Sequence, residues 1–124
     1  MLLILLAAAA ASCSNAQTQA DMTQCASRAY ATSDAVMTRQ WKVTYAYMKK
    51  RDAQDTSRGG GFGYAAALLA SQRAWLKYRD TQCVLSAGEF AGGSMQPMAG
   101  AQCKARLTNA REGRAAARSA SRPG

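Results

Sequence analysis

Apolar residues recur every three or four positions through the first half of the chain, as one buried stripe of an α-helix requires. Thr18 and Asp21 precede the stripe as a capping-box variant, because the Thr hydroxyl can accept a hydrogen bond from the backbone N–H of Asp21. The stripe comprises Met22, Ala26, Ala29, Val36, Met37, Trp41, Tyr45 and Met48, while the charged Arg28, Asp34, Arg39 and Lys42 fall mainly outside it. We therefore expect a helix from Thr18 to the polar run 49–52.

A second stripe with helical spacing predicts a helix over residues 64–86. One broad face of this helix carries Ala65, Leu68, Leu69, Gln72, Trp75, Leu76, Arg79 and Cys83. The segment between the stripes, Gly-Gly-Gly-Phe-Gly at 59–63, lacks the glycine order, the preceding strand and the following Lys of a phosphate-binding loop. We interpret it as a turn between antiparallel helices.

Residues 86–101 are rich in Gly, Ala, Ser, Pro and Met, a composition that predicts one long loop. A third helix is expected to start near Cys103 and to fade at Gly113. The Ala, Arg and Ser residues of 113–124 predict a basic, disordered tail. The expected fold class is all-α, a small up-down-up three-helix domain over residues 13–112 with one long Gly-rich loop, stapled by two disulfides.

Residues 1–12 have the features of a signal peptide, because their apolar run matches an h-region and is too short to span a bilayer. No Lys or Arg precedes Leu2, so we expect the true start codon to lie upstream. Small residues permit cleavage before Cys13 or after Ala16. We expect an exported protein, periplasmic or secreted, with lipid anchoring at Cys13 as the alternative.

Four cysteines, Cys13, Cys25, Cys83 and Cys103, form an even set in a chain expected to be exported, which predicts two disulfides. No C-x-x-C pair and no His accompanies them, so no metal site is expected. Three connectivities are possible, and none is excluded, because the helix ends that carry the cysteines meet at one end of an up-down-up bundle. We favour Cys83 with Cys103 and Cys13 with Cys25.

The 124 residues suffice for one small domain, and 16 Lys and Arg against 7 Asp and Glu give a net charge of +9. This charge favours anionic partners, of which envelope polymers and lipid headgroups suit an exported protein and nucleic acid does not. The absence of His removes the usual general base and the commonest metal ligand. We therefore expect no enzyme, no catalytic residue and no cofactor.

Four segments carry a family resemblance: Thr-Gln-Ala-Asp-Met-Thr-Gln-Cys-Ala at 18–26, Ser-Gln-Arg-Ala-Trp-Leu-Lys-Tyr-Arg-Asp-Thr-Gln-Cys at 71–83, Gly-Gly-Ser-Met-Gln-Pro-Met at 92–98, and Cys103 with Leu-Thr-Asn-Ala-Arg at 107–111. In this order they resemble the LprI-type lysozyme-inhibitor domain of bacterial envelope proteins. The resemblance implies a small exported helical domain with two disulfides that inhibits lysozyme, the muramidase with which hosts attack peptidoglycan.

Two groups of residues are candidates for a role. The first is expected to be structural, with Trp75 filling the core and Arg79 pairing with carbonyls and with Asp80; the alternative makes Trp75 and Arg79 a binding platform for sugar or peptide. This group comprises Gln72, Trp75, Tyr78, Arg79 and Asp80. The second lies in the expected loop, where we would place an inhibitor contact, and comprises Glu89, Phe90, Gly92, Gly93 and Ser94.

Two functions follow from these observations. The first is a binding protein that blocks a muramidase by occupying its cleft, with no chemistry of its own. The second is a basic structural or stress-related envelope protein that binds anionic surface polymers or lipid headgroups. An enzymatic function is disfavoured, because Glu89 is a single carboxylate and a glycosidase needs a pair.

Overall fold

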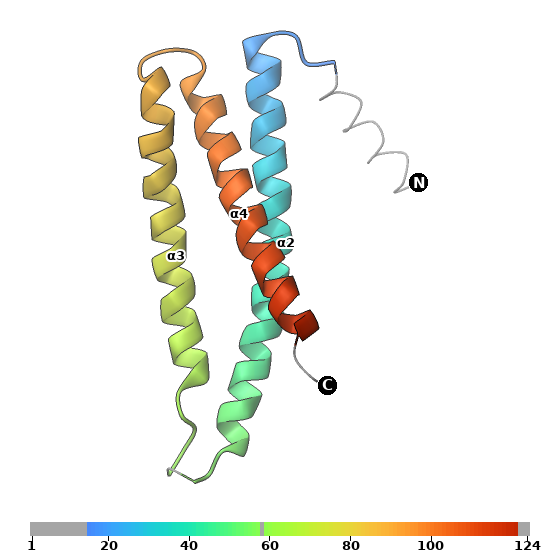
Figure 1. The fold of residues 1–124 in the computed structure, drawn as a ribbon, viewed down its shortest axis with the longest axis vertical. Coiled ribbons are helices and arrows are strands. Elements are labelled where there is room, and N and C mark those ends of the chain that lie inside the picture. Colours follow the sequence, from blue (N-terminus) through green and yellow to red (C-terminus); the bar gives the residue numbers. More distant parts are fainter. Residues whose placement is uncertain (1–14, 58, 122–124) are drawn as a thin grey trace.

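The computed structural model describes residues 15–57 and 59–121, and over these residues the chain forms three α-helices and no strand. The helices are α2 (Gln19–Gln54), α3 (Tyr64–Ala87) and α4 (Gln96–Ser121), with the short 3₁₀ helix η1 (Gly88–Phe90) after α3. Successive helices are antiparallel and lie beside one another, so in Figure 1 α2 runs down, α3 up and α4 down. The all-α, three-helix fold expected from the periodicity is confirmed. No helix in the described ranges combines the length and the apolar character needed to cross a bilayer.

Local capping fixes where α2 begins. The Thr18 hydroxyl accepts a hydrogen bond from the backbone N–H of Asp21 over 3.1 Å, as the sequence predicts. The helix passes the polar run 49–52 and ends at Gln54. Lys and Arg are good helix formers, so a polar run of this kind does not by itself end a helix.

The end of α2 also caps the start of α3. The carboxylate of Asp52 accepts hydrogen bonds from the backbone N–H groups of Gly63, Tyr64 and Ala65 at 3.0, 2.9 and 3.0 Å. Gly61 lies so close that a Cβ there would stand 2.5 Å from the Cβ of Asp52, which explains the glycine at this position. The turn between α2 and α3 is therefore specified by one acidic side chain.

The connection between α3 and α4 is shorter than expected, and the prediction of a long loop over 86–101 was wrong. Helix α4 begins at Gln96, well before Cys103. Pro97 lies in its first turn, where no intrahelical N–H bond is lost. Gly100 lies inside the helix, where a Cβ would be 3.8 Å from that of Ala87 on α3. A methyl group added there would stand at ordinary van der Waals distance, so the packing of α3 against α4 does not require glycine at this position.

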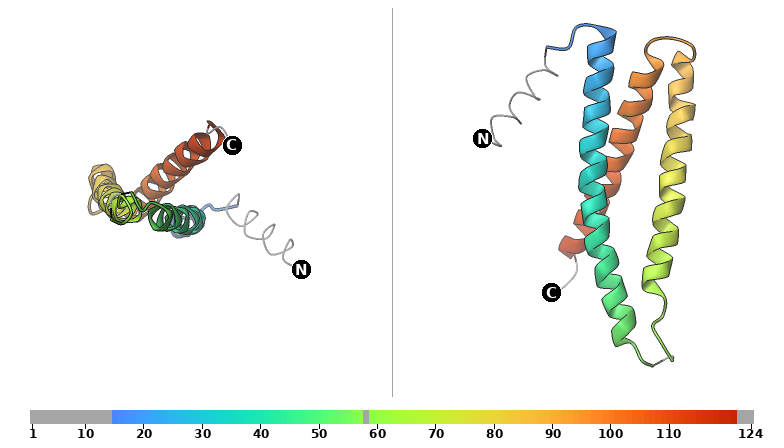
Figure 2. Two further views of the ribbon diagram at one scale, coloured as in Figure 1. Left: turned by 90° about the horizontal axis from the view of Figure 1, so that it is seen from below. Right: turned by 180° about the vertical axis from the view of Figure 1, so that it is seen from behind.

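The far end of α4 also differs from expectation. The helix does not fade at Gly113 but continues to Ser121, because the segment after Gly113 is rich in Ala and Arg, which favour helix. The predicted tail boundary at residue 113 therefore falls inside a helix. In Figures 1 and 2, α2 and α3 extend past the end of α4, so the bundle finishes as a two-helix hairpin.

The core is narrow and partly polar. Its buried side chains are Ala26, Met37, Ala65, Cys83, Ala87 and Cys103, together with the polar Ser33, Gln72, Arg79 and Thr108. Among the described residues Met37 is the only long apolar side chain in this set. Apolar burial of this extent stabilises a domain weakly, so hydrogen bonds and crosslinks carry more of the stability than in an ordinary bundle.

One disulfide lies within the described residues, where the sequence predicts two for the whole chain. It joins Cys83 on α3 to Cys103 on α4, whose Cα atoms are 5.5 Å apart, and it matches the favoured pairing. Cys25 is disulfide-bonded as well. The partner predicted for it, Cys13, lies outside the described residues, as does the predicted signal segment 1–12, so that pairing stays a prediction.

Candidate functional site

The turn between α3 and α4 brings the predicted loop residues together at one end of the bundle. Glu89 and Phe90 lie in η1, and Gly92 follows with a φ of +78°, a conformation that favours glycine. The backbone N–H of Gly93 donates to the carbonyl of Phe90 over 2.9 Å. The Gln96 side chain accepts from the N–H of Gly92 over 3.1 Å. The turn is thus held in one shape by its own hydrogen bonds.

The disulfide braces the base of this turn. Cys83 and Cys103 are both fully buried and lie 20 residues apart in sequence. Closing a loop of this length contributes about 3 kcal/mol by the chain-entropy model. The crosslink therefore fixes α3 against α4 directly beneath the exposed residues of the turn.

An apolar surface is exposed at this end. Val84 and Leu85 on α3 are 70% and 72% exposed, far more than apolar side chains of a packed helix. We call this region the α3–α4 surface, and it comprises Val84, Leu85, Glu89, Phe90, Ser94 and Met95, with Gly92 and Gly93 in the turn between them. Exposed apolar groups gathered with one carboxylate are typical of a protein-binding surface.

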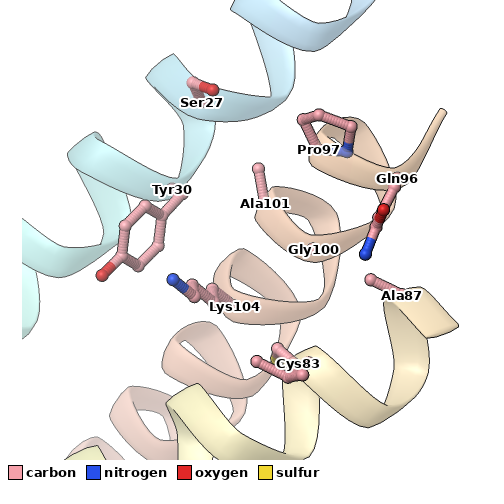
Figure 3. A pocket seen from close by; sticks show the side chains of 10 residues that line it. Ser27, Tyr30, Cys83, Ala87, Gln96, Pro97, Gly100, Ala101 and Lys104 are labelled. Atoms are coloured by element: carbon pink, nitrogen blue, oxygen red, sulfur yellow. The ribbon is translucent and has the colours of Figure 1, made fainter. Parts of the chain in front are cut away.

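An open pocket of about 380 Å³ lies beside the α3–α4 surface, between all three helices. Its walls are mostly apolar and are formed by Ser27, Tyr30, Cys83, Val84, Ala87, Gln96, Pro97, Gly100, Ala101 and Lys104. Figure 3 shows the side chains of Tyr30 and Lys104 extending toward one another across it, and the Lys104 ammonium lies 5.4 Å from the centre of the Tyr30 ring. Burial raises the pKa of the Tyr30 phenol more than the Arg79 charge lowers it, so Tyr30 is neutral at pH 7.

Beneath the pocket, Arg79 connects the three helices. Its guanidinium donates to Asp34 and Tyr30 on α2 over 2.8 and 2.9 Å, and to Thr108 on α4 over 3.3 Å. On its own helix it donates to Asp80 over 3.0 Å. Burial opposes the charge, but the bonds to Asp34 and Asp80 raise the pKa of Arg79 above its ordinary value. The charge is therefore retained in the core.

Gln72 and Trp75 belong to a second polar layer, about two turns and one turn before Arg79 on α3. The Gln72 carbonyl oxygen accepts from Arg111 on α4 over 3.0 Å. The Arg111 guanidinium also lies 4.7 Å from the centre of the Trp75 ring, and Arg79 lies 5.5 Å from the same ring. Trp75 is half-buried between two cations, so its ring packs by cation–π contacts.

The expectation that Tyr78 belongs to the structural core was wrong. Its side chain is 53% exposed, because it lies one position before Arg79, about 100° around the helix axis. Asp80 is also exposed, although its carboxylate reaches back to Arg79. The alternative of a binding platform formed by Trp75 and Arg79 fits poorly, since Arg79 is buried.

Sequence reasoning missed the partners of Arg79. Asp34 falls outside the apolar stripe, yet it supplies the carboxylate for the buried guanidinium. Tyr30 and Asp34 are spaced by four on α2, and this pairing of polar groups was the available signal. The apolar pattern marks neither Thr108 nor Lys104, although Thr108 lies in the family motif at 107–111, because their contacts depend on how α4 packs.

Charged side chains are sparse at the end of the bundle that carries the α3–α4 surface. Residues 15–57 and 59–121 contain no group of three or more Cys, Asp and Glu side chains that could hold a metal ion. Between Asp80 and Lys104 the sequence has Glu89 as its one charged side chain. The arrangement is suited to binding another molecule by shape and apolar contact.

Comparison with known proteins adds a family assignment. Residues 9–114 match the family described as Lysozyme inhibitor LprI. An uncharacterized protein of Rhizobium meliloti (strain 1021) is 37% identical over 100 residues, which cover 80% of this chain and 72% of that protein. No solved structure matches the chain. The matched residues include the α3–α4 surface and the pocket. They also include the Arg79 cluster, by which we mean Arg79 and its hydrogen-bond partners Tyr30, Asp34, Asp80 and Thr108.

Proposed function

The chain belongs to the LprI family of lysozyme inhibitors, and from this premise we propose that it is a non-catalytic protein that binds a muramidase through its α3–α4 surface. We further propose that it acts outside the cytoplasm, where a muramidase would reach the cell wall. The observation that carries the proposal is the exposure of Val84, Leu85, Phe90 and Met95 on a disulfide-braced end of the bundle.

The distribution of charge supports this choice of surface. Animal lysozymes are basic, so a chain with a net charge of +9 would be repelled if its cations faced the enzyme. No Lys or Arg occurs between Asp80 and Lys104, and Glu89 lies within this segment. A basic enzyme would therefore meet few like charges at the α3–α4 surface, of which Lys104 beside the pocket is one.

The rigidity of the surface supports tight binding. The disulfide Cys83–Cys103 lies below the turn, and the Gln96 side chain holds the backbone of Gly92. A contact surface that is ordered before binding loses less conformational entropy when the complex forms. Phe90 is the aromatic residue of the turn, and aromatic side chains often contribute a large share of binding energy.

A muramidase uses two carboxylates that flank the scissile bond, with an open cleft between them. Glu89 is a single carboxylate and the chain has no His, so the α3–α4 surface lacks the groups for glycoside hydrolysis. Its apolar residues would instead fill the cleft and exclude the polysaccharide.

The experiment is a clearing assay in which the full chain is titrated into a lysozyme acting on bacterial cell walls. The proposal predicts loss of clearing at about one chain per enzyme molecule. A second assay with a short soluble oligosaccharide separates inhibition from coating of the wall: an inhibitor slows both reactions, whereas a protein that covers anionic wall polymers slows clearing alone. Unchanged oligosaccharide hydrolysis at a large molar excess of the chain would contradict the proposal.

A further inference from the structure

The opposite end of the molecule is the two-helix hairpin formed by the end of α2 and the start of α3. Figures 1 and 2 show that α4 does not reach this end, so no third helix covers it. Two aromatic side chains are correspondingly exposed there, Tyr47 at 50% and Phe62 at 59%. We call this region the α2–α3 end, and its described residues are 47–57 and 59–64.

Cations and aromatic rings lie close together at the α2–α3 end. The Arg51 guanidinium lies 4.2 Å from the centre of the Tyr64 ring, and the Phe62 ring centre lies 4.8 Å from that of Tyr64. Lys49 and Lys50 are exposed beside them. Tyr47 and Arg51 are four residues apart and so share one face of α2. The end thus presents rings and positive charges together.

The acidic side chains of this end are engaged within the protein. Asp52 accepts three backbone N–H bonds at the start of α3. Asp55 accepts from the hydroxyl and the backbone N–H of Ser57 at 2.6 and 3.1 Å. Bonds to neutral donors orient these carboxylates but leave their negative charges in place. In the sequence, residues 47–64 carry Lys49, Lys50, Arg51 and Arg58 against these two carboxylates, which gives a net charge of +2.

We propose that the α2–α3 end docks on an anionic lipid bilayer. Phe62 and Tyr47 lie at the boundary between headgroups and acyl chains, and Lys49 and Lys50 contact lipid phosphates. With Tyr47 at this boundary, the part of α2 that precedes it holds the α3–α4 surface about 40 Å from the membrane. This proposal does not depend on which partner binds the α3–α4 surface.

A bilayer fits this end better than a soluble anionic polymer does. A soluble polymer of phosphate or carboxylate groups would bind through the cations alone, and the exposed rings would add little to its affinity. Exposed rings at the tip of a hairpin leave water when they enter the boundary of a hydrocarbon layer, which a soluble polymer does not provide. The combination of rings and cations is the composition of membrane-surface segments.

The experiment places a fluorescent probe at each end of the full chain. Phe62→Trp and, as the matched control, Phe90→Trp are mixed with vesicles of 30% phosphatidylglycerol in phosphatidylcholine that carry brominated acyl chains. Because Trp41 and Trp75 also fluoresce, quenching is taken relative to the parent chain, and we expect strong added quenching in F62W and at least threefold weaker added quenching in F90W. Adding Lys49→Gln and Lys50→Gln to F62W should lower vesicle affinity about fivefold for each lysine. Tyr47→Trp provides a second probe of the same end.

Equal quenching of F62W and F90W would overturn the proposal, as would F62W quenching that is the same in vesicles without phosphatidylglycerol. Polyphosphate tests the competing class of partner. A shift of F62W emission with polyphosphate, without quenching by anionic vesicles, would assign the α2–α3 end to a soluble polymer and would also overturn the proposal.

Discussion

Arg79 on α3 donates to the carboxylate of Asp34 on α2 over 2.8 Å, and this ion pair joins a buried guanidinium to a partly exposed carboxylate. The same guanidinium reaches Thr108 on α4, so one side chain connects all three helices. In a core whose apolar residues are mostly small, a hydrogen-bonded cation replaces the large aliphatic side chains that usually align helices.

Replacement of Arg79 by Ala should lower the free energy of unfolding by about 3 kcal/mol, because Asp34, Tyr30 and Thr108 lose their shared donor inside the bundle. Asp80→Ala is the control, since its exposed carboxylate contributes at most about 1 kcal/mol. Urea unfolding followed by circular dichroism measures both changes. Equal losses in the two variants would show that the Arg79 cluster does not hold the helices together.

Removal of the disulfide Cys83–Cys103 should lower the free energy of unfolding nearly as much as Arg79→Ala does. The double variant Cys83→Ser and Cys103→Ser is expected to lose about 3 kcal/mol of stability, because the unfolded chain regains the freedom of a loop of 20 residues. Using the variant rather than a reductant leaves the bond of Cys25 intact. A loss below about 1 kcal/mol in urea unfolding would mean that α3 and α4 are held mainly by packing.

Asp52 should make stability depend on pH. Hydrogen bonds from the backbone of Ala65 and Tyr64 lower the pKa of its carboxyl below the ordinary 3.8. A group of this kind stabilises the fold fully above its unfolded pKa, and this contribution is lost as the pH falls through the lower folded value. Asp52→Ala should therefore unfold at a lower temperature than the parent chain at pH 7, and the difference should narrow toward about pH 2. A difference that is constant with pH would exclude this role.

Variants of the α3–α4 surface separate binding from stability. Phe90→Ala should weaken inhibition of a lysozyme about tenfold, as loss of an aromatic contact residue does, with little change in unfolding temperature. Phe62→Ala at the opposite end is the matched control and should inhibit like the parent chain. The inhibition constants come from the soluble-oligosaccharide assay. If both variants weakened inhibition equally, Phe90 would not be a residue that contacts the lysozyme.

The helices themselves were predictable, because their apolar residues recur with a period close to that of the α-helix. The α3–α4 connection was not, since composition alone treats Pro97 and Gly100 as breakers of helix. In the structure Pro97 lies in the first turn of α4, and Gly100 lies inside the helix beside Ala87 of α3. Whether such residues end a helix depends on their position in it and on the neighbouring element.

The candidate site, like the fold, was predictable from the sequence only in part. The turn residues Glu89 and Phe90 could be located from the sequence because they lie in one short segment. The partners of Arg79 and the pocket beside Lys104 could not, since each is assembled from three helices. Contacts between residues 29 to 49 positions apart leave no periodic signal in a single sequence.

The most direct test of the central claim is calorimetric titration of a lysozyme with the full chain, with and without an oligosaccharide that fills the enzyme's cleft. If the α3–α4 surface occupies the cleft, the chain should bind at a ratio of about one to one, and saturating oligosaccharide should weaken the apparent affinity by at least tenfold. Binding that is unaffected by the oligosaccharide, or no binding to any of a panel of animal lysozymes, would contradict the account.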